Sequence, residues 1–412
     1  MSRNDLAQHL RPGDVLVAAQ VLGEPTALLD ALFEQGPLPE SLRLFVGMSL
    51  TDVLTRCPAG IRPVTSVGMP PNGGLIARGD MDLVPCHMSE LPWLLSAGPL
   101  STDVAIVAVS PPDPDGWCSL GVISDYAAPA VAHARVVLAE INDQVPVVGG
   151  DTRVHLDRIT ASIRTSRPLP EYPKAVPSDL ERAIGANIAP YVRDGSCIQV
   201  GIGKLGEAVL AAVSDRHDLG VHSGMIGDTL LEMMREGIVT NKAKEIDRGV
   251  SVAGAVLGSA RAVALAADEP NLVLREIAYT HDPARIAEIS NFVCVNSALE
   301  VDLFGQVNSE TAGGRYVGAI GGSVDYLRAA VRGPGGRSIV ALPASTGKGT
   351  SRIVPRVERV TALGADVDVI ATEHGVAELR GCSAGERARR LIAVAAPEAR
   401  PALRQAADEA GL

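Results

Sequence analysis

Short apolar runs alternate with helical patterns along the chain. Residues 25–33 carry leucines and a phenylalanine at the spacing of one helix face, which predicts a helix. The run at 104–109 has no polar residue, as in strands that are buried on both faces of a parallel sheet. This alternation of strands and helices predicts an α/β fold. In the first part of the chain, the expected strands are residues 14–19, 43–47, 104–109 and 135–139.

A proline-rich segment divides the pattern in two. Residues 166–177 contain Pro168, Pro170, Pro173 and Pro177, which disfavour regular structure and suit an extended linker. We therefore expect an N-terminal domain at 1–165, a linker at 166–177 and a C-terminal domain at 178–412.

The second half begins with a helix signal. Ser178 and Glu181 have the spacing of a capping box, so a helix is expected over 178–191. A strand at 196–200, a glycine loop and a helix through 208–213 should follow. The next strand is expected at 219–222. From residue 386 onward the chain is rich in Ala, Arg and Glu, which favours amphipathic helices on the outside of the protein.

The glycine loop at 201–206 matches the pattern GxGxxG and leaves three interpretations open. A dinucleotide site also requires an acidic residue at the end of the next strand, where this chain has Ser223 and Gly224, and Asp228 lies beyond them. A structural tight turn is the second interpretation. The third is a loop whose backbone amides face an anion or an oxyanion, since glycines allow a ligand to approach the backbone closely.

Composition narrows the possible partners. Aromatic residues make up 3% of the chain, so Ala, Val, Leu and Ile must build the core. The net charge of −11 argues against a nucleic-acid surface but leaves room for a small anionic ligand. Six scattered cysteines without metal-ligand spacing suggest reduced packing thiols and a cytoplasmic protein. No apolar stretch approaches the roughly 20 residues of a membrane span.

Several segments together resemble the acetyl-CoA hydrolase/transferase family. Each segment alone is weakly specific, but their order and spacing are informative. In the first half they are Ser110-Pro111-Pro112-Asp113, Gly116-Trp117-Cys118-Ser119-Leu120-Gly121 and Glu140-Ile141-Asn142-Asp143-Gln144. In the second half they are the glycine loop, Asn296-Ser297-Ala298-Leu299-Glu300, Gly318-Ala319-Ile320-Gly321-Gly322, Ser351-Arg352-Ile353-Val354-Pro355 and Thr372-Glu373-His374-Gly375.

The resemblance implies two related CoA-transferase-type α/β domains with mostly parallel sheets and the active site between them. It also implies an acyl-CoA thioester as substrate, no metal or other cofactor, and a homodimer. In this family a glutamate attacks the acyl-CoA carbonyl, and a glutamyl-CoA thioester follows. The matching position here is Gly224, which has no side chain to attack anything. Gly201, Gly203, Gly321 and Gly322 look like the family's oxyanion-stabilising backbone.

Other candidate residues each have a structural alternative. Ser223 could be a nucleophile with His222 as its base, although neighbours on a strand point to opposite faces, which favours a hydrogen-bonding role. Glu300 could replace the missing carboxylate, or it could be structural. His374 beside Glu373 could act as an acid or base, or it could be an ordinary hydrogen-bonded histidine. Lys348 and Arg352 could hold CoA phosphates, or they could be solvated surface charges.

Three functional hypotheses follow. The first is thioester hydrolysis or acyl transfer without a glutamyl-CoA intermediate, with water or a group on the substrate attacking above Gly224. The second is a CoA-transferase that uses another carboxylate such as Glu300. The third is a CoA-binding protein without chemistry. If Gly224 has been aligned correctly, Gly224→Glu should raise transferase activity.

Overall fold

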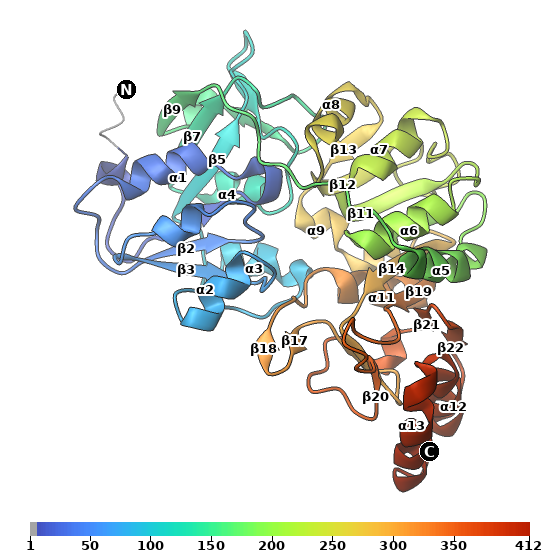
Figure 1. Ribbon diagram of the computed structural model, residues 1–412. Coiled ribbons are helices and arrows are strands. Elements are labelled where there is room, and N and C mark those ends of the chain that lie inside the picture. The colour runs from blue at the N-terminus through green and yellow to red at the C-terminus, as the bar shows by residue number, and fades with distance from the viewer. Residues whose placement is uncertain (1–5) are drawn as a thin grey trace.

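The computed structural model describes residues 6–412, so the first five residues of the predicted N-terminal domain lie outside it. Two sheets, each flanked by helices, lie side by side (Figure 1). The first is a seven-stranded, fully parallel sheet in the order β4-β3-β2-β1-β5-β7-β9. Its strands are β1 (Val15–Ala18), β2 (Leu42–Val46), β3 (Ile61–Thr65), β4 (Asp82–Leu83), β5 (Val104–Val109), β7 (Val136–Asn142) and β9 (Ala161–Thr165).

The second sheet has eight strands in the order β13-β12-β11-β10-β14-β19-β21-β22, and β22 alone is antiparallel to its neighbour. Apart from β22, both sheets follow the same chain order, 4-3-2-1-5-6-7, so the two halves share one topology. Its strands are β10 (Cys197–Val200), β11 (Gly220–Ile226), β12 (Ser251–Val256), β13 (Leu272–Leu274), β14 (Phe292–Ser297), β19 (Arg337–Ala341), β21 (Val369–Thr372) and β22 (Gly375–Glu378).

Helices cover both sheets. In the first half they are α1 (Thr26–Phe33), α2 (Asn72–Arg78), α3 (Leu91–Ser96) and α4 (Ala127–His133). In the second half they are α5 (Asp179–Ile188), α6 (Lys204–Ala212), α7 (Asp228–Arg235), α8 (Ala260–Asp268), α9 (Ile277–Thr280), α10 (Pro283–Ile286), α11 (Ser323–Arg332), α12 (Ala384–Val394) and α13 (Arg400–Glu409). The last two form the outer C-terminal end that the Ala/Arg/Glu composition predicted (Figure 1).

Short strands complete the fold outside the two main sheets. One small sheet pairs β6 (Trp117–Ser119) with β8 (Arg153–His155), and another joins β15 (Glu300–Asp302), β16 (Val307–Asn308) and β20 (Ile353–Val354). The hairpin of β17 (Thr311–Ala312) and β18 (Arg315–Tyr316) reaches toward α2, where Gly68 N–H donates to Gly318 O at 2.7 Å. This hairpin therefore ties the second half to the first.

Most sequence predictions of elements are confirmed. Strands occur at all six expected apolar runs, residues 166–177 contain no helix or strand, and Ser178 and Glu181 form the capping box that starts α5. One prediction is wrong: the strand expected at 219–222 continues as β11 to Ile226, so Gly224 lies inside it. Pairing with β12 sustains this extension, because Ser223 stands opposite Ala253 and Met225 opposite Ala255.

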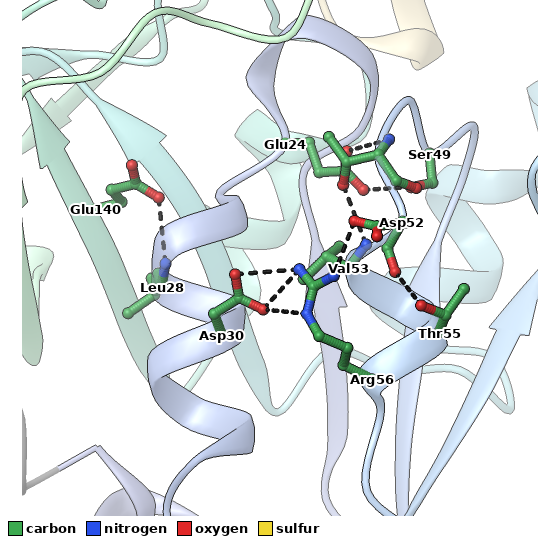
Figure 2. Close-up of polar contacts among 10 residues, drawn as sticks. Glu24, Leu28, Asp30, Ser49, Asp52, Val53, Thr55, Arg56 and Glu140 are labelled. Carbon is green, nitrogen blue, oxygen red and sulfur yellow. Dashed lines mark hydrogen bonds and ion pairs between the residues drawn. The ribbon is translucent and has the colours of Figure 1, made fainter.

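The linker is packed rather than free, and two buried glutamates help to fix its beginning. Glu140 on β7 accepts hydrogen bonds from the Leu28 amide on α1 and from the Arg167 guanidinium. Figure 2 shows the Glu140 carboxylate reaching α1, and Glu24 bound to Ser49 in the loop after β2. Arg167 also donates to the Glu24 carbonyl at 2.9 Å. These contacts fix the loops that follow β1 and β2.

Loops of the first half also extend the second sheet. Val256 N–H donates to Val122 O at 2.9 Å, and Ser124 N–H donates to Gly254 O at 2.9 Å. One continuous hydrophobic core contains residues of both halves, including Val17 and Ile123 from the first and Val221 from the second. The carboxyl ends of strands from the two sheets consequently face each other across a shared space.

Candidate active site

A cavity of about 370 Å³ lies between the two halves. In the second half it is bounded by the ends of β10 and β14, between which the strand order reverses, and this is where open α/β sheets commonly bind ligands. Loops that follow β1, β2 and β3 form the opposite wall. The wall is mostly apolar with a few polar groups, a character typical of small-molecule sites. Its apolar lining includes Met48, Met69, Met88, Ile202, Met225 and Ile277.

The glycine loop runs along one edge of this cavity. Gly201 lines the cavity, but its N–H already donates to Val295 O at 2.8 Å. The N–H of Ile202 has no hydrogen-bond partner among residues 6–412, so it is the loop amide available to a ligand in the cavity. Gly203 has φ +101° at the start of α6 and lines a smaller pocket behind the loop.

The second glycine pair lies at the start of α11. Gly321 has φ +58° and Gly322 is the N-cap residue, and both line the cavity. The N–H of Gly322 has no hydrogen-bond partner within residues 6–412, whereas the backbone of Gly321 is paired with that of His87 in an isolated bridge. Free amides at a helix N-terminus favour a developing negative charge. The first half docks here, because Ser89 donates to the Asp325 carboxylate on α11 through both its hydroxyl (2.7 Å) and its amide (3.1 Å).

Gly224 lines the cavity, and an imidazole lies against it. A Cβ atom at position 224 would lie 2.7 Å from both Cε1 and Nε2 of His281, closer than side-chain atoms normally approach. A Cβ atom at Gly322 would overlap the same ring. The ring of His281 packs on Tyr326, with ring centroids 4.9 Å apart. The absence of side chains at positions 224 and 322 is therefore what makes room for the imidazole.

His281 is 5% exposed and lines the cavity from the end of α9. Burial, with a smaller contribution from nearby His222, lowers the pKa of His281 to about 3. Burial likewise lowers the pKa of His222 to about 3. Both rings are consequently neutral at physiological pH.

A buried carboxyl from the first half also lines the cavity. Asp125 accepts a hydrogen bond from Gln20 Nε2 at 2.6 Å, and the Gln20 oxygen in turn accepts one from the Met48 amide. Burial raises the pKa of Asp125 to about 6, although hydrogen bonds from Gln20 and two backbone amides oppose the shift. Asp125 can therefore change its protonation state close to neutral pH.

The predicted Ser223 and His222 do not form a catalytic pair. Ser223 lines the cavity, but its hydroxyl donates to Met225 O at 2.7 Å. Both ring nitrogens of His222 are buried without a hydrogen-bond partner, and its ring stacks against Tyr279. Their alternation on β11 separates the two side chains, as the strand geometry predicts.

Glu300 and His374 lie outside the cavity lining. Glu300 on β15 accepts a hydrogen bond from Asn308 at 3.1 Å. His374 lies on the exposed turn between β21 and β22, and the neighbouring Glu373 accepts a hydrogen bond from the Ala344 amide at 2.8 Å. The structure does not bring either residue to Gly224.

Lys348 and Arg352 also lie outside the lining but differ in their surroundings. Lys348 is exposed on a tight turn that Thr346 stabilises through its hydroxyl. Arg352 is half-buried and donates to Ala298 O at 3.4 Å, and Ala298 lines the cavity. Arg352 is therefore directly hydrogen-bonded to a residue of the cavity wall.

The acidic residue considered for dinucleotide binding is engaged elsewhere. Asp228 is the first residue of α7, beyond the end of β11, and its carboxylate accepts hydrogen bonds from the hydroxyl and amide of Ser259. It therefore serves the junction between α7 and α8, not the glycine loop.

Sequence reasoning missed His281, Asp125 and Gln20. None belongs to a motif with characteristic spacing, and they come from three distant parts of the chain that meet only in the folded protein. A weak signal was present for Asp125, because it is the one charged residue in the largely apolar segment 120–131.

Two family models match this chain. The acetyl-CoA hydrolase/transferase N-terminal domain matches residues 1–176, and the C-terminal domain of the same family matches residues 258–407. The 4-hydroxybutyrate coenzyme A transferase of Clostridium kluyveri is 34% identical, covering 94% of this chain and 92% of that protein. The chain belongs to the acetyl-CoA hydrolase/transferase family.

Two further proteins are similar to this chain over nearly its whole length. The crystal structure of RipA from Yersinia pestis superposes with a TM-score of 0.94 at 33% identity, covering 100% of this chain and 97% of that one. An acetyl-CoA hydrolase of Eremothecium gossypii is 26% identical over 94% of this chain and 83% of its own length. The CoA-transferase fold expected from the sequence is therefore confirmed.

The described residues contain neither a metal-binding cluster nor a membrane-spanning helix. Among residues 6–412, no group of three or more His, Cys, Asp or Glu side chains is arranged to hold a metal ion. Within the same residues, no helix is both long enough and apolar enough to cross a membrane.

Proposed function

We propose that this chain cleaves acyl-CoA thioesters, by hydrolysis or by acyl transfer, without a glutamyl-CoA intermediate. Family membership supports the thioester substrate, because its relatives include both CoA transferases and an acetyl-CoA hydrolase. The observation that carries the mechanistic part is the contact between Gly224 and His281. The place where a nucleophilic side chain on β11 would begin is filled by an imidazole.

The cavity offers what a thioester requires. Its apolar wall suits a pantetheine arm and an acyl chain. The free amides of Ile202 and Gly322 can hold the oxyanion that forms when the carbonyl is attacked. Arg352 and Lys348 remain candidates for the CoA phosphates beyond the cavity.

The alternative of a transferase with another carboxylate has less support. Glu300 does not line the cavity. Asp125 does, but both of its carboxylate oxygens accept hydrogen bonds, from Gln20 and from backbone amides. The hypothesis of a CoA-binding protein without chemistry also has less support, because it gives no role to the unpartnered backbone amides that line the cavity.

The test is a panel of acyl-CoA thioesters, with release of free thiol measured with and without added carboxylic acids. Hydroxylamine or borohydride trapping, followed by mass spectrometry, then searches for an enzyme-bound acyl or CoA group. We expect thiol release or transfer with no glutamyl adduct. An adduct on Glu300 or Asp125 would support the carboxylate route instead. Thermal stabilisation by CoA without turnover would support the binding-protein hypothesis.

A further inference from the structure

The imidazole of His281 has one nitrogen held and one nitrogen free. Its Nδ1 lies 2.9 Å from the Thr280 hydroxyl, and its Nε2 has no hydrogen-bond partner among residues 6–412. Nε2 lies on the ring edge that faces Gly224 and Gly322, both of which line the cavity. The free nitrogen is thus directed to the place where substrate chemistry is expected.

The hydrogen bonds of Thr280 determine which nitrogen carries the proton. A hydroxyl has one proton to donate, and a carbonyl oxygen can only accept. Thr280 Oγ1 also contacts the Glu276 carbonyl at 3.3 Å, so in that bond the hydroxyl is the donor. Both contacts can be hydrogen bonds only if Nδ1–H of His281 donates to Thr280 Oγ1. In this tautomer Nε2 carries a lone pair and can accept a proton.

We propose that His281 is the catalytic general base of this site, acting from Nε2 on the nucleophile that attacks the thioester. This inference rests on the proposed function. In hydrolysis, the oxygen of water bonds to the carbonyl carbon while one proton passes to Nε2. The carbon–sulfur bond then breaks, and the imidazolium returns that proton to the departing sulfur. The products are the free acid and the CoA thiol.

The surroundings of His281 favour this cycle. Burial lowers the pKa of His281, so the resting ring is neutral with its lone pair available, but the same burial also weakens it as a base. The oxyanion that forms at the amide of Gly322 lies next to the ring, and its negative charge raises the basicity of the imidazole at the moment of proton transfer. Tyr326 holds the preceding turn, because its hydroxyl donates to Thr280 O at 2.9 Å.

Other titratable groups near the cavity are less suited to the role. His222 has no access to the cavity, and the hydroxyl of Ser223 is bonded to a backbone carbonyl. Asp125 lies close to Gly224, because its backbone bonds to Gly254 and Ile277, but both of its carboxylate oxygens already accept hydrogen bonds. His281 alone combines a free acceptor atom with contact to both Gly224 and Gly322.

The test compares His281→Gln with the control His217→Gln, using the acyl-CoA that gives the fastest thiol release in the wild type. Glutamine retains a polar group near Nε2 but cannot accept a proton. Because general-base catalysis typically contributes about 10²–10⁴-fold, we expect kcat to fall at least about 100-fold, with little change in KM. His217 is on the surface, with an 80% exposed side chain, and its variant should keep the wild-type kcat.

Chemical rescue provides a second measurement that does not depend on one substitution. His281→Ala leaves an imidazole-sized space between the two glycines, so added imidazole should restore part of the thiol release. Restored rate in this variant, and none in His217→Ala, is the expected result. A His281→Gln protein with kcat within threefold of the wild type would overturn the assignment while leaving the proposed function intact. If the wild type cleaves no acyl-CoA, the proposed function is wrong, and the catalytic role of His281, which depends on that function, is wrong as well.

Discussion

At the scale of single residues, the position of His281 depends on the absence of a side chain at Gly224. The sequence suggested that Gly224→Glu would create the missing nucleophile. In the folded protein, any Cβ atom at position 224 would meet the imidazole at 2.7 Å. The glycine at position 224 is therefore sterically coupled to His281, which is 57 positions away in the sequence.

This coupling refines the Gly224→Glu experiment. We now expect Gly224→Glu alone to lose thiol release, since the new side chain must displace His281. The double variant Gly224→Glu/His281→Ala has room for the carboxylate and should gain acceptor-dependent CoA transfer. The measurement is CoA transfer between an acyl-CoA and a carboxylic acid, with CoA binding as the check on folding. If the single variant gains transferase activity while His281 stays in place, the steric coupling is wrong.

Asp125 should make stability depend on pH in a direction opposite to that of a salt-bridged aspartate. Its folded pKa of about 6 exceeds the unfolded value of about 3.9. Between these values the unfolded chain ionises while the folded one stays protonated, so stability falls as pH rises. The total loss is about 3 kcal/mol, at about 1.4 kcal/mol per pKa unit, and is complete above pH 6.

Asp125→Asn removes this titration. We therefore expect the unfolding free energy of the wild type, relative to that of Asp125→Asn, to decrease from pH 4 to pH 7. Urea denaturation at several pH values measures this difference. A difference that is the same at pH 4 and pH 7 would mean that the carboxyl is not buried as described.

At the scale of elements, the linker is anchored by a buried ion pair. Arg167 follows β9 and pairs with Glu140 on β7, whose side chain is fully buried. The same carboxylate holds the first turn of α1 (Figure 2). Because the pair joins β7, α1 and the linker, it also orders the first-half loops that line the cavity.

Arg167→Ala should destabilise the protein by about 3–5 kcal/mol, because it leaves Glu140 buried without its partner. The matched control is Arg182→Ala, which removes the exposed ion pair with Asp179 and should cost less than about 1 kcal/mol. Denaturant unfolding of the two variants measures both values. Equal effects would show that the Arg167 pair contributes no more than a surface contact.

At the scale of the whole molecule, the two halves share one core. Val256 and Leu274 on the second sheet form backbone hydrogen bonds with Val122 and Gly149 of the first half. The hydrophobic cluster around them crosses the boundary without a break. Residues 166–177 therefore connect two sheets of the same topology, but the two halves share one hydrophobic core.

Separation of the halves tests this conclusion. The segment 178–412 expressed alone should expose part of the shared core, so we expect it to bind a hydrophobic dye and to lack a sharp thermal transition. The intact protein should unfold in one transition. A cooperatively folded 178–412 fragment with a melting temperature near that of the intact chain would contradict a shared core.

Sequence patterns determined the local structure of this protein. The apolar run at 104–109 forms the fully buried strand β5, and Ser178 with Glu181 supplies a helix cap from four consecutive residues. The order of short motifs was enough to identify the family. Such signals lie within a few residues of each other, so one chain is sufficient to read them.

The tertiary structure decided the composition of the site. The cavity gathers Gln20, Asp125, Gly224 and His281, and no periodicity along the chain relates these positions. The strand register places Gly224 within β11, and the packing of α9 brings an imidazole into the space that its missing side chain leaves. The sequence determined that a carboxylate is absent from position 224. Three-dimensional packing determined what fills its place, because contacts between distant residues depend on how whole elements pack.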